Sequence, residues 1–164
     1  MAVRLALDSW RWAGVPLLIR AGKTMPVTAT EITIRFRPTP FDVLGQGPSG
    51  IRNQLRFRIW PESEFGLSVV GKAPGAGLRT EVHDLVYAQH GAADMRPYDR
   101  LIGAALDGRR LLFARQDTVE AAWRVVDPIL GGAVPLHTYP RGSWGPKEAE
   151  LLLPDGQTWH DPVA

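Results

Sequence analysis

Apolar and polar residues alternate along several short runs in the first ninety residues. The clearest run covers residues 30–37, where Ile32, Ile34 and Phe36 share one face and charged or hydroxyl side chains share the other, as the two-residue period of a strand requires. Residues 55–60 repeat this pattern. Further strands, each bounded by turn-forming residues, are predicted at 16–20, 65–72 and 80–87. About five strands in sequence order are therefore expected.

The last third of the chain changes to the spacing of a helix. Apolar residues recur with the period of a helix that has one buried face at Tyr98, Leu101, Ile102, Ala105 and Leu106. We expect this helix to end at Asp107-Gly108. A second helix is expected to be capped by Asp117 and to stop before Pro128, and a third, shorter one to start near Pro146. Strands followed by helices, without alternation of the two, predict an α+β domain with a large, mainly antiparallel sheet covered by helices.

Length and composition are those of one ordinary globular domain. The 164 residues provide for one hydrophobic core, so residues 1–164 are assigned to a single domain. No apolar run approaches the roughly 18 residues of a membrane span, and the N-terminus lacks the basic and apolar stretches of an export signal. The absence of cysteine excludes disulfides and thiolate metal sites. We expect a soluble, cytoplasmic protein with no membrane partner.

Positive charge is concentrated at one end of the sequence. Residues 1–58 carry nine Arg or Lys against three acids, whereas the remaining residues carry ten against fourteen. This excess favours an anionic ligand, although a solvated sheet face rich in arginine gives the same count. No set of aromatic residues accompanies the charge in the way that stacking on nucleic-acid bases requires. A nucleic-acid partner is therefore not expected.

Two glycine-containing segments imitate nucleotide-binding motifs without their context. Residues 45–50 spell G-x-G-x-x-G, but a predicted strand follows them instead of a helix, and their proline removes an amide from the turn. We interpret this segment as a hairpin loop. Residues 22–24 resemble the end of a P-loop, yet Leu17 stands where the first glycine of that motif would be. Neither segment predicts a nucleotide site.

Arg20 and Lys23 are the candidate anion ligands. They stand three residues apart around a glycine, so a rigid fork and a flexible ammonium can meet one phosphate; the alternative is an ordinary exposed strand end. The histidines show no metal-ligand spacing: His83, His90, His137 and His160. The sequence has no nucleophile elbow or other catalytic signature. The residues alone thus predict no catalytic residue and no metal site.

Residues 8–23, DSWRWAGVPLLIRAGK, resemble the D-x-W-R-W-x-G-V-P-x-x-x-R-x-G-K segment of glucose-6-phosphate dehydrogenases. Further blocks follow in the order of that family, among them TEITIRF at 30–36 and YPRGSWGP at 139–146. The others lie at 53–55, 58–61, 98–102, 112–117 and 120–130. Eight blocks in register over nearly the whole chain make the resemblance highly specific.

The resemblance implies the C-terminal domain of such an enzyme, an α+β domain whose sheet builds a homodimer. It also implies that glucose 6-phosphate lies between this domain and an N-terminal Rossmann domain, and that a hydride passes from its C1 to NADP or NAD. The family's general base is a histidine in a part that this sequence lacks, as it lacks the Rossmann domain. We therefore expect no activity and no bound cofactor for the chain alone. The alternative is a stand-alone, non-catalytic module that oligomerises or regulates a complete relative.

The resemblance also implies substrate-binding residues. Lys23 matches the family lysine that contacts substrate, and Arg20 matches the neighbouring arginine. Five residues after the lysine the family commonly has a second Lys or Arg, whereas this chain has Thr28. A hydroxyl still donates a hydrogen bond, but a cation is lost. The implied substrate ligands are thus Lys23, Thr28 and Arg20.

Some animal members of the family hold a second, structural NADP on this domain. Arg52, Asp84 and Trp159 resemble parts of that site, but Thr33 and Trp144 replace arginines. Because two phosphate-binding cations are missing, a structural NADP is not expected here.

Overall fold

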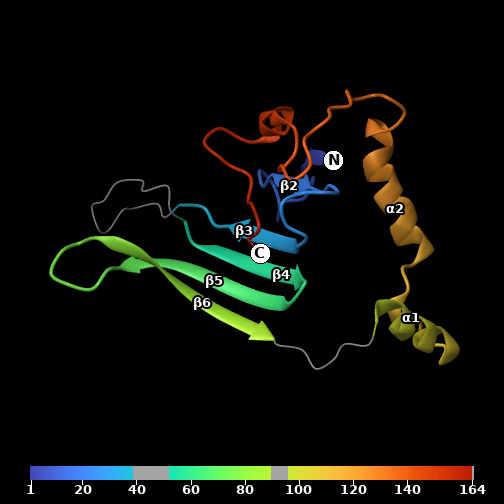
Figure 1. Ribbon diagram of the computed structural model, residues 1–164, viewed down its shortest axis with the longest axis horizontal. Coiled ribbons are helices and arrows are strands. Elements are labelled where there is room, and N and C mark those ends of the chain that lie inside the picture. Colours follow the sequence, from blue (N-terminus) through green and yellow to red (C-terminus); the bar gives the residue numbers. More distant parts are fainter. Residues whose placement is uncertain (39–51, 90–95, 164) are drawn as a thin grey trace. The chain divides into compact units, whose positions relative to one another are not determined.

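The computed structural model describes residues 1–38, 52–89 and 96–163, and the chain divides into two compact units. One unit comprises Met1–His90 with Tyr139–Ala164 and holds the described strands; the other comprises Gly91–Thr138 and holds α1 and α2 (Figure 1). The length of the chain does not predict this division. The glycine-rich segment at 45–50 lies outside the described residues.

The strands form two antiparallel sheets. A small sheet pairs β1 (Ala2–Leu5) with β2 (Leu17–Arg20). The larger sheet has the order β3-β4-β5-β6, and its strands are β3 (Thr30–Arg35), β4 (Gln54–Trp60), β5 (Ser63–Lys72) and β6 (Thr80–Gln89). The five predicted strands and the α+β class are confirmed. The alternation does not predict β1, since four residues are too short a run to show it.

The larger sheet has one apolar and one polar face. A row of apolar and aromatic side chains crosses its strands in register at Ile32, Phe57, Phe65 and Tyr87. The ring centres of Phe57 and Phe65 lie 5.2 Å apart, a distance at which aromatic pairs attract. We define this side as the apolar face, and the side that carries Glu31, Arg56 and Arg58 as the polar face. The alternation predicted for both runs is therefore confirmed.

The apolar face is open. At the two ends of the row, Ile32 is 51% exposed and Tyr87 is 67% exposed, and in its middle Phe57 is 36% exposed and Phe65 is 38% exposed. Within the described ranges, Ala104 and Ala149 are the only hydrophobic residues that are buried. A sheet face of this kind normally lies against a covering layer, because burial of apolar area drives folding. The described residues alone thus enclose very little core.

The two α-helices begin and end at sequence-encoded signals. α1 (Pro97–Leu106) is followed by Gly108 with a φ of 66°, so its predicted end is confirmed. α2 (Gln116–Val126) stops before Pro128, as predicted. The predicted cap at Asp117 is wrong: the N-cap is Arg115, and Asp117 lies inside the first turn. Its carboxylate accepts from the Arg115 guanidinium at 2.6 Å and from the Thr118 amide at 2.9 Å.

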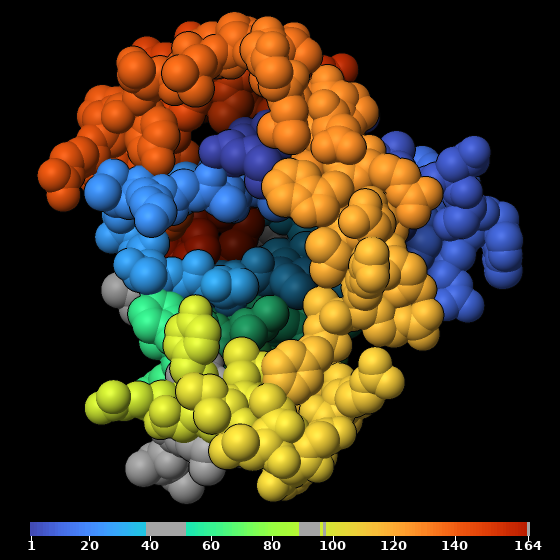
Figure 2. Space-filling model, turned by 90° about the vertical axis from the view of Figure 1, so that its right-hand side faces the viewer, coloured from blue at the N-terminus to red at the C-terminus, as the bar shows by residue number. Residues whose placement is uncertain are grey.

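The apolar stripe of α1 is not buried by the residues of its own unit, so the buried face of this helix stays a prediction. Tyr98 is 77% exposed and Leu106 is 84% exposed. In Figure 2, α1 and α2 are coloured yellow to orange. α1 therefore carries apolar area that its own unit leaves uncovered.

Short 3-10 helices complete the described structure. They are η1 (Arg110–Leu112), η2 (Asp127–Ile129) and η3 (Lys147–Leu152). η3 follows Pro146 directly and confirms the predicted third helix, with Ala149 as its buried residue. Over the residues described, no helix combines the length and the apolar character needed to cross a membrane.

Candidate functional site

The candidate substrate residues lie at and after the end of β2. Arg20 is the last residue of that strand. Lys23 and Thr28 lie in the connection to β3, and both are exposed. The connection thus presents the Lys23 ammonium and the Thr28 hydroxyl to solvent, and each can donate hydrogen bonds to an anion.

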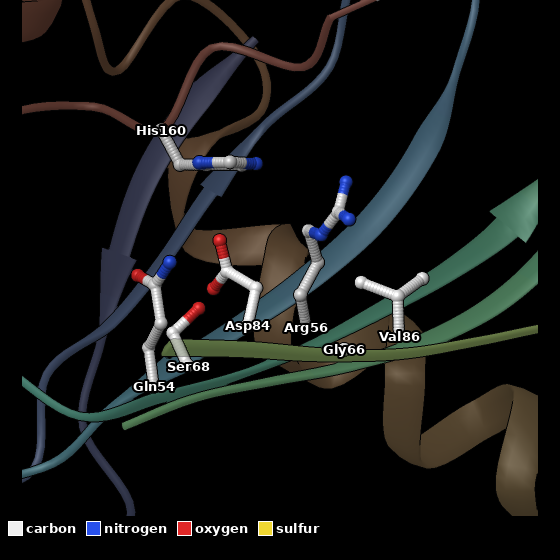
Figure 3. Close-up of a pocket in the computed structure, with 7 residues that line it drawn as sticks. All are labelled: Gln54, Arg56, Gly66, Ser68, Asp84, Val86 and His160. Carbon is white, nitrogen blue, oxygen red and sulfur yellow. The ribbon is translucent and has the colours of Figure 1, made fainter. Parts of the chain in front are cut away.

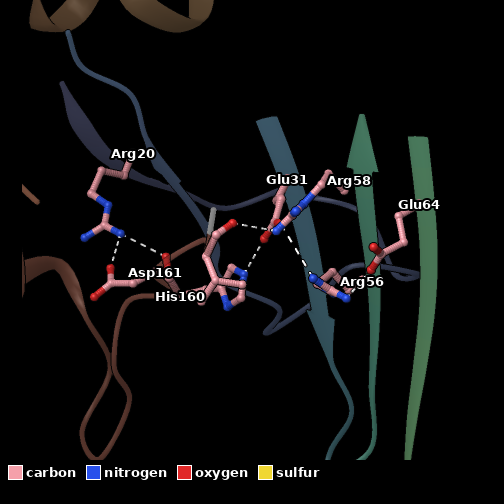
Figure 4. A network of polar contacts seen from close by, with 8 residues as sticks. Arg20, Glu31, Arg56, Arg58, Glu64, His160 and Asp161 are labelled. Atoms are coloured by element: carbon pink, nitrogen blue, oxygen red, sulfur yellow. Dashed lines mark hydrogen bonds and ion pairs between the residues drawn. The ribbon is translucent and has the colours of Figure 1, made fainter. Parts of the chain in front are cut away.

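The Arg20 guanidinium is directed to the C-terminal segment (residues 157–163). Its carbon lies 4.8 Å from the ring centre of Trp144 and 5.3 Å from that of Trp159, a cation–π arrangement on two rings. Its nitrogens donate to the carbonyl of His160 at 2.8 Å and to the carboxylate of Asp161 (Figure 4). The side chain is only 10% exposed. Arg20 is therefore engaged within the chain, and its direct contact with substrate stays a prediction.

The polar face is built around the buried carboxylate of Glu31. Its side chain is 1% exposed, and it accepts a hydrogen bond from Nε of Arg58 at 2.5 Å. Nε2 of His160 lies 2.6 Å from the other oxygen, and this nitrogen is the donor because a carboxylate can only accept (Figure 4). Arg56 forms a longer ion pair with Glu31, at 3.7 Å, and a close one with Glu64. A buried charge is stable only with such partners.

These partners also set the ionisation of Glu31. Burial alone would raise the pKa of this carboxyl group. Hydrogen bonds from His160 and Arg58, together with the charge of these groups, outweigh burial and lower the pKa below the ordinary value of 4.5. Glu31 is therefore negatively charged at neutral pH and holds His160 of the C-terminal segment against the sheet.

Arginines of the sheet also bind the backbone of the C-terminal segment. Arg35 donates to the carbonyl of Thr158 at 3.0 Å, and Nη2 of Arg58 donates to the carbonyl of Val163 at 2.8 Å. The Arg58 side chain is 13% exposed. The alternative interpretation is that the arginines of the sheet are only solvated. For Arg58 this is wrong, because its guanidinium binds the backbone of the C-terminal segment.

A pocket of about 210 Å³ opens on the polar face. In Figure 3, side chains of the sheet and His160 of the C-terminal segment surround it, and its lining consists of Gln54, Arg56, Gly66, Ser68, Asp84, Val86 and His160. Its volume is below the roughly 300 Å³ of small ligand sites. Arg56 is already paired with Glu64, and Asp84 adds negative charge. The pocket therefore does not fit the phosphates of a dinucleotide.

Thr33 and Trp144 stand where the resemblance implies arginines. Neither side chain offers a cation to the phosphates of a dinucleotide. The hydroxyl of Thr33 is buried and makes no hydrogen bond in the structure, so it offers a dinucleotide no charge. Trp144 stacks on Arg20 and contributes a ring instead of a guanidinium. The residues present thus do not form a structural NADP site.

Two of the described histidines, His83 and His160, lie beside carboxylates. Over the described residues, no group of three or more His, Asp or Glu side chains could hold a metal ion. His83 lies 3.6 Å from Glu81, and both are about half exposed. The contact of His160 with Glu31 joins residues 129 positions apart, so no local sequence signal announces it. His90 lies outside the described residues.

Comparison with known proteins finds similarity to one enzyme family along the chain. Residues 1–160 match the family described as "Glucose-6-phosphate dehydrogenase, C-terminal domain". The glucose-6-phosphate 1-dehydrogenase of Aggregatibacter actinomycetemcomitans is 42% identical over 171 residues, which cover 99% of this chain and 34% of the relative. Glucose-6-phosphate 1-dehydrogenase 1 of Mycobacterium tuberculosis H37Rv is 37% identical over 164 residues, which cover 99% of this chain and 35% of the relative.

Solved structures show the same similarity. The crystal structure of glucose-6-phosphate 1-dehydrogenase from Mycobacterium avium matches 99% of this chain and 35% of its own, with a TM-score of 0.85 and 36% identity. A structure of a glucose-6-phosphate dehydrogenase in complex with its substrate glucose-6-phosphate matches 98% of this chain and 34% of its own, with a TM-score of 0.76 and 27% identity. The chain thus spans about a third of the length of the relatives it matches.

Acid should weaken the attachment that Glu31 makes. Because its pKa is lowered in the folded protein, its contribution to stability is fully present above the unfolded value of 4.5 and is lost as the pH falls through the folded value. Glu31→Gln should reduce the free energy of unfolding at neutral pH by about 1 to 3 kcal/mol. It should also flatten the decline in that free energy between about pH 5 and pH 3, measured by urea titration.

Glu150→Gln is the matched control, because Glu150 is exposed. This variant should keep the pH dependence of the unmodified chain. If the free energy of unfolding declined on acidification to the same extent in Glu31→Gln and in the unmodified chain, the prediction would be contradicted.

Proposed function

Since the chain belongs to the glucose-6-phosphate dehydrogenase family and matches its C-terminal domain, we propose that it is the substrate-binding and dimer-forming part of such an enzyme. The complete enzyme oxidises glucose 6-phosphate to 6-phosphogluconolactone with NADP or NAD, in the pentose phosphate pathway. The observation that carries the proposal is the match over residues 1–160, which includes the R-x-G-K turn with Lys23 exposed. The proposal includes the cytoplasmic location that the sequence predicts.

Lys23 and Thr28 are the proposed contacts to the substrate. An exposed ammonium forms a charge-assisted hydrogen bond with a phosphate oxygen, about twice as strong as a neutral one. Thr28 adds a hydroxyl donor from the same connection but no charge. Arg20, whose guanidinium is held by Asp161 and two indole rings, is proposed to support this turn from the end of β2.

The coenzyme and the catalytic base are proposed to come from outside this chain. The sequence has no nucleotide-binding fingerprint in the right context, and the relatives are about three times as long as the region they share with it. A non-catalytic oligomerisation or regulatory module is the second candidate function. The open apolar face favours that candidate, because such a surface is typical of a protein that associates with another.

The chain alone should not turn over glucose 6-phosphate. Purified protein mixed with the sugar phosphate and NADP or NAD should give no increase in reduced coenzyme above a blank, because the proposal places the coenzyme-binding domain and the catalytic base elsewhere. The complete Aggregatibacter enzyme is the positive control in the same assay. Turnover that persists after trace host enzyme has been removed would refute this.

Lys23→Ala should weaken the binding of glucose 6-phosphate to the chain. A charge-assisted contact is worth about 1.5 to 3 kcal/mol, so the dissociation constant should rise roughly ten- to a hundredfold. Titration followed by NMR measures this constant. Thr28→Arg, which restores the commoner family cation, should tighten glucose 6-phosphate more than glucose.

Lys147→Ala removes the same group from another exposed position and is the matched control. It should leave the affinity unchanged. If Lys23→Ala changed only stability, and the affinity for the sugar phosphate stayed the same, Lys23 would be an ordinary strand-end charge and the site assignment would fail.

A homodimer through the larger sheet is the other part of the proposal. The polar face is occupied by the C-terminal segment through Arg58 and Glu31. The apolar face, with Ile32 and Phe57, remains available for association. We therefore propose that the apolar face contributes to the dimer contact.

Light scattering should give about twice the chain mass of 18.1 kDa at micromolar concentrations. Phe57→Glu places a charge on the apolar face and should shift the mass toward that of the monomer, because burying an unpaired charge is costly. Val134→Glu, at a residue 51% exposed in the second unit, should not. A mass near 18 kDa for the unmodified chain would rule out the dimer.

A further inference from the structure

The turn that carries Lys23 is tied to residues 139–142 by two hydrogen bonds. The hydroxyl of Tyr139 donates to the carbonyl of Lys23 at 2.9 Å. The amide of Gly142 donates to the carbonyl of Thr24 at 2.8 Å. Tyr139 and Lys23 are 116 positions apart in the sequence, yet they lie in the same compact unit. Two successive carbonyls of the turn thus have fixed partners.

Thr24 has a backbone conformation that the rest of the turn must stabilise. Its φ is 56°, and within the described ranges it is the only residue other than glycine with a positive φ. This left-handed conformation is disfavoured for a β-branched residue and persists only where the surroundings determine it. The hydrogen bond from Gly142 to the Thr24 carbonyl is one such constraint, and it acts directly beside Lys23.

Gly22 allows the close approach of Tyr139. A Cβ atom at this position would lie 2.8 Å from the tyrosine hydroxyl and 3.2 Å from Cε of Met25. No carbon is tolerated at 2.8 Å from that oxygen without displacing it. The glycine of the R-x-G-K motif is therefore matched to the tyrosine that begins the Y-P-R-G motif at 139–142.

We propose that Tyr139 is a positioning residue for Lys23. Its hydroxyl fixes the backbone from which the ammonium extends, so that Lys23 meets the substrate phosphate from an ordered turn. The inference rests on the proposed function, in which Lys23 binds that phosphate. A turn that is ordered beforehand loses less conformational freedom on binding. Loss of the hydrogen bond from Tyr139 to the Lys23 carbonyl therefore weakens substrate binding, although no side chain that contacts the phosphate has been removed.

The test uses the whole chain and the variant Tyr139→Phe, which removes the hydroxyl and keeps the ring. We expect the amide hydrogens of residues 22–25 to exchange faster, while those of β4 and β5 keep their protection. The dissociation constant for glucose 6-phosphate should rise about two- to tenfold, as for the loss of one neutral hydrogen bond. Tyr98→Phe, the same change at a residue 77% exposed on α1, should alter neither quantity.

Gly22→Ala tests the contact from the other side. The added methyl group should displace the Tyr139 hydroxyl and so reproduce the effect of Tyr139→Phe. In the Tyr139→Phe background, Gly22→Ala should cost little further affinity, because the group that it displaces is already gone. If the losses of affinity in the two single variants added up fully in the double variant, the Tyr139 hydrogen bond would not be the cause of the effect of Gly22→Ala.

The measurements separate this inference from the proposed function. If Lys23→Ala weakens binding and Tyr139→Phe does no more than Tyr98→Phe, the positioning role is overturned and the substrate site stands. If Lys23→Ala leaves the affinity unchanged, the proposed function fails and the role of Tyr139 toward substrate fails with it. Faster exchange at 22–25 together with weaker binding in Tyr139→Phe supports the inference. Unchanged exchange there overturns it.

Discussion

A single buried carboxylate, that of Glu31, constrains the arrangement of the first unit. A charge that is 1% exposed requires hydrogen-bonding partners, and they come from two distant parts of the chain, Arg58 on β4 and His160 near the C-terminus. Glu31 is therefore satisfied only when β4 lies beside β3 and the C-terminal segment crosses the polar face. Arg20 makes a second attachment of that segment through Asp161, so both sheets hold the same stretch of chain.

This attachment separates the surfaces that the chain uses internally from those it leaves open. The positive charge of residues 1–58 does not form a free basic surface on the sheet, because Arg56 and Arg58 are paired with Glu64 and Glu31. Lys23, on the connection after β2, remains exposed. The side of the sheet opposite the network keeps its apolar row uncovered. Ligand binding is thus proposed at the connection, and association at the apolar face.

Local features of the fold are predictable from the sequence because their causes are local. The alternation around Ile32 and the helix stop before Pro128 each depend on neighbouring residues. The cap at Asp117 failed because the helix already begins at Gln116, which places Asp117 inside the first turn. The Glu31 network joins residues more than a hundred positions apart, and no periodicity carries that information. For the site, the family resemblance indicates Lys23, but it gives no reason to connect it with Tyr139.

The R-x-G-K motif specifies the residue types of Arg20 and Lys23 but not the direction in which each side chain extends. A planar guanidinium suits the space between two indole rings, whereas a flexible ammonium suits a ligand that arrives from solvent. At the position of Trp144 the resemblance implies an arginine in some animal members of the family. An arginine at 4.8 Å would repel Arg20, while the indole attracts it. Trp144 therefore provides a ring that holds the Arg20 guanidinium, and Arg20 in turn attaches the C-terminal segment through His160 and Asp161.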